Sequence, residues 1–125
     1  MKPVDQTKFG RGAGNCLAAC VASLLDLSID EVFDIPLGGK DPDYWEIVAG
    51  WLKPRGLALV HMDVDPEKGI GPVVPWGMHY MAWGPSARGL EHSVIYCRGQ
   101  LAHDPHPDRS GIQKVRALAF LARLT

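Results

Sequence analysis

The sequence lacks any long hydrophobic run. No apolar stretch approaches the roughly 20 residues that a helix needs to cross a bilayer. Residues 1–6 also lack the apolar segment of a secretory signal peptide. We therefore expect a cytoplasmic protein with no membrane partner.

The chain has no excess of charge of either sign. Its 13 Lys and Arg residues nearly balance its 14 Asp and Glu residues, which gives a formal net charge of −1. A protein without a strong overall field is not drawn to the phosphates of nucleic acid or to anionic lipid. We expect no nucleic-acid partner and consider a peptide or another amide-containing substrate instead.

Cysteine is scarce, and the three cysteines, Cys16, Cys20 and Cys97, form an odd set. Such a set does not resemble the disulfide framework of a small secreted protein, so we expect free thiols. The chain has no internal repeat and no biased linker. Its 125 residues, 46% of them hydrophobic, can build one core without metal or disulfides. We expect a single domain over residues 1–125.

Glycine and proline are plentiful and divide the chain into short elements. A glycine-rich loop over residues 8–14 leads into strong helix formers, which predict a buried helix over residues 16–25 with Asn15 as its N-cap. A capping box predicts a short helix over residues 28–33. Apolar residues at helical spacing predict a third helix over residues 42–52.

From residue 57 onward, short apolar or alternating runs are separated by Gly and Pro turns, which is typical of an antiparallel sheet. The tail over residues 115–124 fits either a helix or a strand, and its alternating apolar residues favour a strand. The expected strands cover residues 57–62, 78–83, 92–96, 100–103 and 115–124. Because the helices come first and the sheet second, the order indicates an α+β fold.

Cys16 stands at the first turn of its expected helix, where a thiol is most reactive. Free amides and the helix dipole stabilise a thiolate there. The preceding glycines let a substrate backbone approach and leave main-chain amides available to bind an oxyanion. The alternative role of Cys16 is that of a small core residue. Cys20 lies one turn later in an apolar stretch, and we expect it to pack.

A zinc site made of Cys16, Cys20 and two histidines is a further alternative. Structural zinc pairs usually lie on tight turns and have a shorter cysteine spacing than this four-residue helical step. We therefore expect no metal and no other cofactor.

His92 opens an apolar strand, and Asp104 follows the next strand along the chain. In a hairpin, the start of the first strand lies beside the end of the second, so these two residues become neighbours. Asp104 can then hold the tautomer of His92 while the other ring nitrogen faces Cys16. The ordered set predicts a Cys-His-Asp catalytic triad. The alternatives are a hydrogen-bonded core histidine and an Asp-Pro pair that only forms a turn.

These segments resemble the papain-like cysteine peptidase superfamily, particularly its small bacteriocin-processing, double-glycine peptidases and their phage and bacterial relatives. Those proteins carry a Gln ahead of a Cys that begins a helix, then a His at a strand start and an Asp-Pro after it. Residues 14–16, His92 and the Asp104-Pro105 step match this order. The resemblance implies a compact papain-like fold, with the cysteine helix packed on a C-terminal antiparallel sheet.

The resemblance also implies a thiol hydrolase, either a peptidase or an amidase. The family's glutamine helps to stabilise the oxyanion and lies closer to its cysteine than Gln6 does to Cys16, so Gln6 and Asn15 are both candidate oxyanion donors. Leu17 stands where the family commonly has glycine. The alternative function is that of a non-catalytic papain-like module that binds a peptide or a partner protein.

Trp76, His79 and Tyr80 are candidate substrate-binding residues, because aromatic side chains in and near a strand can line a cleft. More often such residues belong to a core. We also expect the loop over residues 86–89 to border the site, and the apolar tail could pair across a dimer.

His103 and His106 flank Asp104 in a segment rich in Pro and Asp. They could tune the aspartate, contact substrate or bind metal. The composition of the segment favours solvent-facing turn residues.

Overall fold

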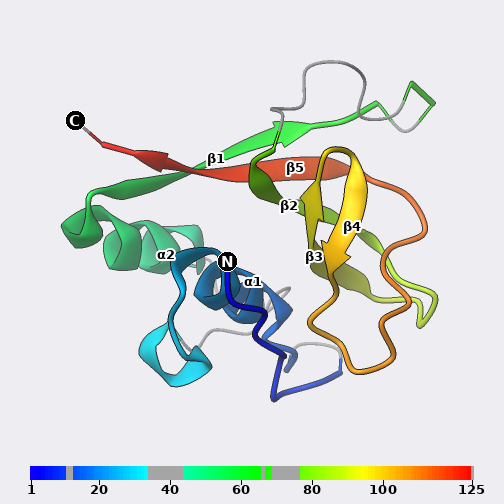
Figure 1. Cartoon of the computed structure of the whole chain (residues 1–125), viewed down its shortest axis with the longest axis horizontal. Coiled ribbons are helices and arrows are strands. Elements are labelled where there is room, and N and C mark those ends of the chain that lie inside the picture. Colours follow the sequence, from blue (N-terminus) through cyan, green and yellow to red (C-terminus); the bar gives the residue numbers. More distant parts are fainter. Residues whose placement is uncertain (11–12, 34–43, 66, 69–76, 125) are drawn as a thin grey trace.

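The structure, a computed structural model, describes residues 1–10, 13–33, 44–65, 67–68 and 77–124. Figure 1 shows helices in the first half of the chain and a sheet in the second. The helical elements are α1 (Cys16–Leu25), η1 (Ile29–Glu31), α2 (Tyr44–Leu52) and η2 (Lys53–Arg55). The strands are β1 (Leu57–Asp63), β2 (His79–Pro85), β3 (Glu91–Cys97), β4 (Gln100–His103) and β5 (Ala117–Arg123).

The five strands form one antiparallel sheet in the order β1-β5-β2-β3-β4. This arrangement confirms the α+β expectation. The tail is strand β5 and lies between β1 and β2, as the alternation of its apolar residues predicts. Most strand ends differ from the expected ones by one or two residues, and the others coincide with them.

Helix α1 begins at Cys16, as expected, and its residues from Cys16 to Ser23 are buried. It ends at Asp26, which adopts the left-handed conformation and donates its amide to the carbonyls of Ala22 and Ser23. Asn15 is the N-cap of this helix, as expected, but its side chain makes no cap hydrogen bond. Its carbonyl oxygen instead accepts the amides of residues 7 and 8.

The second helical prediction is only partly right. A 3-10 turn, η1, replaces the expected helix over residues 28–33, and the side chain of Ser28 makes no cap bond. The third prediction corresponds to α2. Its expected start at Pro42 lies outside the described residues. The helical path ends at Gly56, whose φ of 72° is the left-handed conformation that glycine adopts without strain.

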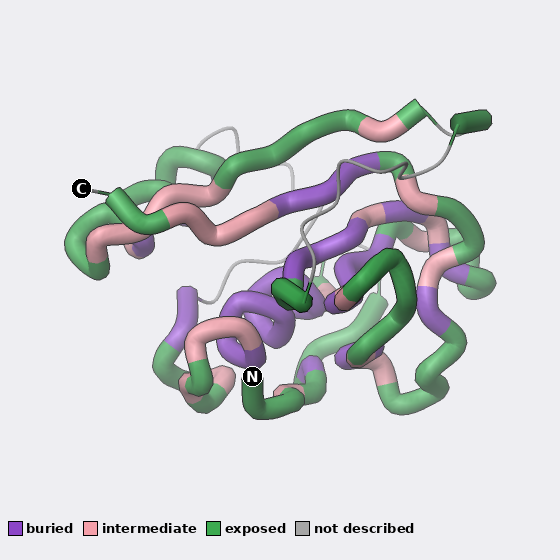
Figure 2. The backbone as a smooth tube through the Cα atoms, turned by 45° about the horizontal axis from the view of Figure 1, so that its top comes forward, coloured by how far each residue is buried: buried purple, intermediate pink, exposed green. Residues whose placement is uncertain are grey.

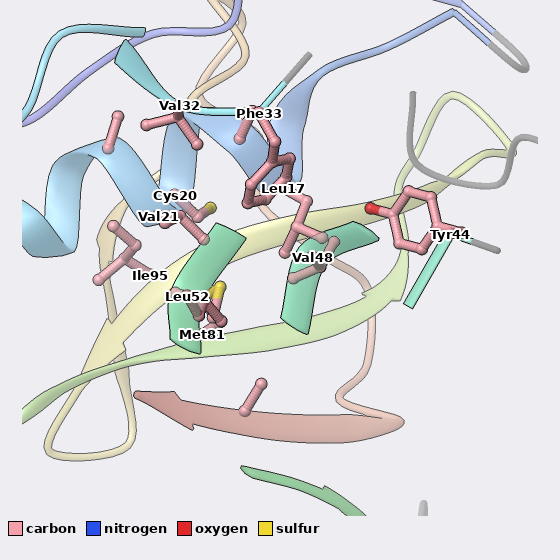
Figure 3. Packing of buried hydrophobic residues seen from close by; sticks show 13 residues of the cluster. Leu17, Cys20, Val21, Val32, Phe33, Tyr44, Val48, Leu52, Met81 and Ile95 are labelled. Carbon is pink, nitrogen blue, oxygen red and sulfur yellow. The ribbon is translucent and has the colours of Figure 1, made fainter. Parts of the chain in front are cut away.

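The apolar core has two parts, one on each face of the sheet. On the first face, α1 contacts β2 and β3, α2 contacts β1, and the core includes Met81 and Ile95. Cys20 is fully buried in this part, where its packing role is confirmed (Figure 3). On the second face, Tyr80 and Val94 belong to a smaller cluster that also contacts Ile112. The purple buried segments in Figure 2 follow α1 and the central strands.

None of the helices formed by the described residues is long and apolar enough to span a membrane.

Candidate active site

The β3–β4 hairpin carries the candidate histidine and aspartate. Its turn consists of residues 98–99, both with positive φ, which is the geometry of a tight type I′ hairpin. Cys97 pairs with Gln100 next to the turn, but Ile95 pairs with His103. Strand β4 therefore has one extra residue, a β-bulge.

The bulge decides which face Asp104 occupies. Side chains alternate along a strand, so one extra residue reverses the face of every residue that follows. Continued one residue past β4, the shifted register places Asp104 across from Val94 and on the same face as His92. A regular ladder would have placed it across from Ser93, on the opposite face.

His92 and Asp104 form a buried hydrogen-bonded pair. The Nε2 atom of His92 lies 2.7 Å from the Oδ1 atom of Asp104, and the two residues are 3% and 2% exposed. A bond of this length to a carboxylate is typical of a charge-assisted hydrogen bond. The aspartate thereby fixes the ring orientation of His92 and leaves Nδ1 as the ring nitrogen for another partner.

Backbone amides hold Asp104 in place. Its Oδ1 atom accepts the amide of His106 at 2.9 Å, and its Oδ2 atom accepts the amide of Gly111 at 2.7 Å. Burial raises the pKa of Asp104, but the hydrogen bonds from His92 and from these two amides outweigh it and lower the pKa below its ordinary value. Asp104 is therefore a carboxylate at neutral pH and acts as a hydrogen-bond acceptor.

Cys16 lines the same cleft as His92, and its thiol is close enough to the ring to influence the pKa of His92. Burial lowers the pKa of His92, whereas its interactions with Asp104 and Cys16 raise it, and the net result is a pKa of about 9. An imidazolium at neutral pH is the partner that stabilises a thiolate. His92 therefore lies between Asp104, to which it is hydrogen-bonded, and Cys16, which shares its cleft.

A cleft of about 550 Å³ opens onto Cys16 and His92. One wall comes from the N-terminal segment and its glycine loop, with Gln6, Phe9 and Gly14 among its residues. The opposite wall includes the β2–β3 loop over residues 86–89, as expected from the sequence, and polar groups of the segment before β5. The cleft is large enough to bind an extended peptide or a molecule of similar size.

Gln6 and Asn15 occupy different places. Gln6 is buried and lines the cleft together with Cys16, and its Nε2 atom donates to the carbonyl of Lys8 at 3.0 Å. Asn15 lines a separate, smaller hollow that does not include Cys16. The Nδ2 atom of Asn15 donates to the hydroxyl of Thr7. The structure thus places Gln6 in the same cleft as Cys16, whereas Asn15 holds the segment before Cys16.

Residues far apart in the sequence anchor the N-terminal segment to the loop after β4. Arg109 makes a two-bond ion pair with Asp5, at 2.6 and 2.7 Å, and also donates to the backbone carbonyl of Asp104. The amide of Gln6 donates to the carbonyl of Pro105 at 3.0 Å. One loop therefore positions both the candidate oxyanion donor and the triad aspartate. The sequence analysis missed Arg109, and no local pattern signals a pairing across 104 residues.

The two histidines beside Asp104 are not both solvent-facing. The expectation is wrong for His103, whose side chain is 9% exposed and donates to the carbonyl of Val4 at 3.0 Å. His106 lines the cleft, with its ring 5.3 Å from that of Phe9 and 6.2 Å from that of His92.

Two of the three expected substrate-binding residues, Tyr80 and His79, do not line the cleft. Tyr80 is fully buried in the second-face cluster, and its hydroxyl accepts the amide of Gly99. His79 is exposed at the start of β2, where it pairs with Cys97, at the end of the hairpin far from His92. Trp76 lies outside the described residues.

Within the described part of the chain, no three His, Cys, Asp or Glu side chains come together as a metal-binding group. The zinc alternative therefore has no ligand set there.

Comparisons of the chain with protein-family models, with curated proteins and with solved structures find no match.

Proposed function

We propose that this protein is a papain-like cysteine hydrolase, a peptidase or amidase that cleaves an amide or related acyl bond. The observation that carries the proposal is that Cys16 and His92 line one cleft and that His92 is hydrogen-bonded to the buried Asp104. A thiol at the start of a helix, a histidine with a raised pKa and a buried carboxylate are the groups that nucleophilic catalysis needs.

In the first half of the reaction, the thiolate of Cys16 attacks the substrate carbonyl carbon. The carbonyl oxygen becomes an oxyanion, which the amide of Cys16 and the Nε2 group of Gln6 stabilise. The first amides of a helix have no intrahelical acceptor, so the amide of Cys16 is free for this role. The imidazolium of His92 then protonates the leaving nitrogen, the C–N bond breaks, and a thioester remains on Cys16.

In the second half, water hydrolyses the thioester. His92, now neutral, takes a proton from a water molecule, and the resulting hydroxide attacks the acyl carbon. The C–S bond breaks to release the acid and the Cys16 thiolate, and the proton stays on His92, which restores the ion pair. Asp104 keeps the ring of His92 aligned through both steps.

The first test is the pH dependence of Cys16 alkylation by iodoacetamide, followed by mass spectrometry. A free thiol titrates at about 8.5. We expect Cys16 to be alkylated at mildly acidic pH, where an ordinary thiol reacts slowly, and His92→Ala to abolish this low-pH reaction. Cys97 is half-exposed at the other end of β3 and serves as the comparison within the same molecule.

The buried thiol of Cys20 provides a second comparison. Burial raises the pKa of Cys20 well above its ordinary value, so this residue should remain unmodified while the protein is folded. If Cys16 reacts only as slowly as Cys97 in both proteins, the hydrolase proposal is wrong. The non-catalytic, peptide-binding module is then the better description.

A further inference from the structure

His106 places a second imidazole ring in the cleft, next to the ring of His92. Its backbone amide donates to the carboxylate of Asp104, and its ring lies 6.2 Å from that of His92, at an angle of 82°. The side chain is 20% exposed and lines the cleft together with Cys16 and His92. The proposed reaction uses only one of these two rings, so the second is available for a different task.

The contacts of Nδ1 fix the position of the ring proton of His106. Nδ1 accepts the amide of Asp108 at 3.1 Å, so the neutral ring carries its proton on Nε2. Nδ1 also lies 3.2 Å from Oδ1 of Asp108, an oxygen that already accepts the amide and the hydroxyl of Ser110. In an imidazolium both nitrogens carry protons. Nε2 is therefore an N–H donor in either charge state, and no hydrogen bond joins it to any residue that the structure describes.

The position of His106 beside His92 indicates which part of a substrate it meets. In the proposed reaction His92 protonates the leaving nitrogen, so the chain that follows the cleaved bond runs past His92. The neighbouring ring of His106 therefore meets the first groups beyond that nitrogen. In a peptide, the first acceptor there is the carbonyl oxygen of the residue that supplies the leaving nitrogen. A simple amide has no such carbonyl.

Phe9 lies next to His106 in the cleft. The two rings meet edge to face with their centres 5.3 Å apart, and 47% of Phe9 is exposed. The segment that carries Phe9 lies against the loop after β4, because the amide of Gln6 donates to the carbonyl of Pro105 (Figure 1). An exposed aromatic ring in a cleft can bury an apolar side chain of a ligand.

The two arginines of the cleft are already paired. Arg88 forms an ion pair with Asp108, and Arg116 forms one with Glu91. Because each guanidinium has a carboxylate partner, these groups offer little net charge to attract a charged side chain of the substrate. An uncharged, apolar side chain fits this cleft better.

We propose that His106 and Phe9 bind the leaving-group side of a peptide substrate. Nε2 of His106 donates to the carbonyl oxygen of the residue that follows the cleaved bond, and the ring of Phe9 contacts the apolar side chain of that residue. This assignment rests on the hydrolase function proposed above. It narrows the substrate to a peptide with an apolar residue after the cleaved bond.

Transfer of an acetyl group to amines tests this subsite. The thiolate of Cys16 takes the acetyl group of p-nitrophenyl acetate, and p-nitrophenol leaves with the proton of His92. An amine then attacks the thioester, a C–N bond forms, the C–S bond breaks, and His92 takes a proton from the amine. This step reverses the cleavage of an amide, so the amine occupies the leaving-group subsite. Mass spectrometry measures the ratio of acetylated amine to acetate.

Three amines separate the two contacts. Leucinamide has both the carbonyl and an apolar side chain, 3-methylbutylamine lacks the carbonyl, and glycinamide lacks the side chain. His106→Phe should lower the use of leucinamide and glycinamide about fivefold and spare 3-methylbutylamine. His106→Gln keeps an N–H donor and should retain the use of leucinamide. Phe9→Ala should lower the use of leucinamide and 3-methylbutylamine about fivefold and spare glycinamide.

His79→Phe is the matched control. His79 is exposed at the far end of β2, so this variant should use all three amines as the parent does. Comparing each amine between parent and variant cancels the intrinsic basicity of that amine.

The outcomes separate this subsite from the hydrolase function. An equal loss of all three amines in His106→Phe, or a loss of leucinamide that His106→Gln fails to rescue, would overturn the donor role of His106. Loss of glycinamide in Phe9→Ala would overturn the apolar contact, and unchanged use of leucinamide in both variants would overturn the subsite. If p-nitrophenyl acetate does not acetylate Cys16 faster than Cys97, the hydrolase function itself is wrong, and the subsite with it.

Discussion

Gln6 and Asn15 carry the same amide group, but their hydrogen bonds give them different roles. The Nε2 group of Gln6 uses one hydrogen for the carbonyl of Lys8, which leaves its second hydrogen for an oxyanion in the cleft. The side-chain oxygen of Asn15 accepts two backbone amides, and its Nδ2 atom donates to the hydroxyl of Thr7. Of the two residues, only Gln6 lines the cleft that contains Cys16, so we assign the proposed oxyanion role to Gln6.

We therefore predict that Gln6→Ala weakens oxyanion binding and leaves the ion pair intact. A peptide aldehyde forms a thiohemiacetal with a catalytic cysteine and sets an oxyanion in the same position. The aldehyde concentration that protects Cys16 from iodoacetamide should rise about 100-fold in this variant. The alkylation rate without aldehyde should not change, because the contact between Cys16 and His92 is retained.

Asn15→Ala is the matched control, since it removes the other side-chain amide that the sequence offers as an oxyanion donor. It should leave aldehyde protection unchanged but lower the free energy of unfolding by about 1–3 kcal/mol, because the amides of Thr7 and Lys8 lose their acceptor. Loss of protection in Asn15→Ala, with normal protection in Gln6→Ala, would reverse the two assignments.

At the level of elements, Gly84 permits a close crossing. It is the cross-strand partner of His92, and a Cβ atom added to it would lie 1.9 Å from the carbonyl oxygen of Lys114. The segment that crosses there leads from Gly111, whose amide holds Asp104, to strand β5. No side chain can be placed at residue 84 unless this segment moves.

We predict that Gly84→Ala lowers the free energy of unfolding by about 1–3 kcal/mol, as overpacking does. Gly50→Ala is the control of opposite sign. Gly50 is exposed in α2, with nothing within 4 Å of an added Cβ, so alanine should stabilise the helix by about 0.5–1 kcal/mol. Urea denaturation of the two variants measures both values. Equal effects would mean that the Lys114 crossing is not tight.

The elements also show what local sequence can predict. Short apolar or alternating runs between Gly and Pro turns located the five strands of the described residues, and the glycine loop before apolar helix formers located the start of α1 at Cys16. The prediction that His92 and Asp104 are neighbours agrees with the structure, but the hairpin argument behind it was incomplete. The bulge in β4 sets the face of Asp104, and no residue in β4 signals it.

Across the whole molecule, the parts of the site that sequence analysis missed depend on distant contacts. Asp5 and Arg109 meet only because the N-terminal segment crosses the loop that follows β4. His103 faces the carbonyl of Val4 for the same reason. The composition of its segment predicts that His103 is a solvent-facing turn residue, because local composition does not show which distant segment will cover the side chain. Tyr80 shows the same limit, because its aromatic ring fits a cleft and a core equally well until the packing is known.

The buried pair of His92 and Asp104 also links the stability of the whole fold to pH. The pKa of His92 is about 9 in the folded protein and 6.5 ordinarily. The folded state therefore binds more protons than the unfolded state between these values. The stabilising contribution of His92 is complete below pH 6.5 and is lost as the pH rises through about 9. Asp104 has a lowered pKa, so its contribution is lost only as the pH falls through that value, in the acid range.

We predict that the free energy of unfolding, measured by urea denaturation, falls between about pH 6.5 and 9 and that His92→Gln flattens this decline. His79→Gln is the control, because His79 is exposed at the far end of β2 and its loss should leave the decline in place. A decline of equal slope in His92→Gln would show that another group causes it. His92 would then not be an imidazolium in the folded protein, and the ion pair with Cys16 would lose its physical basis.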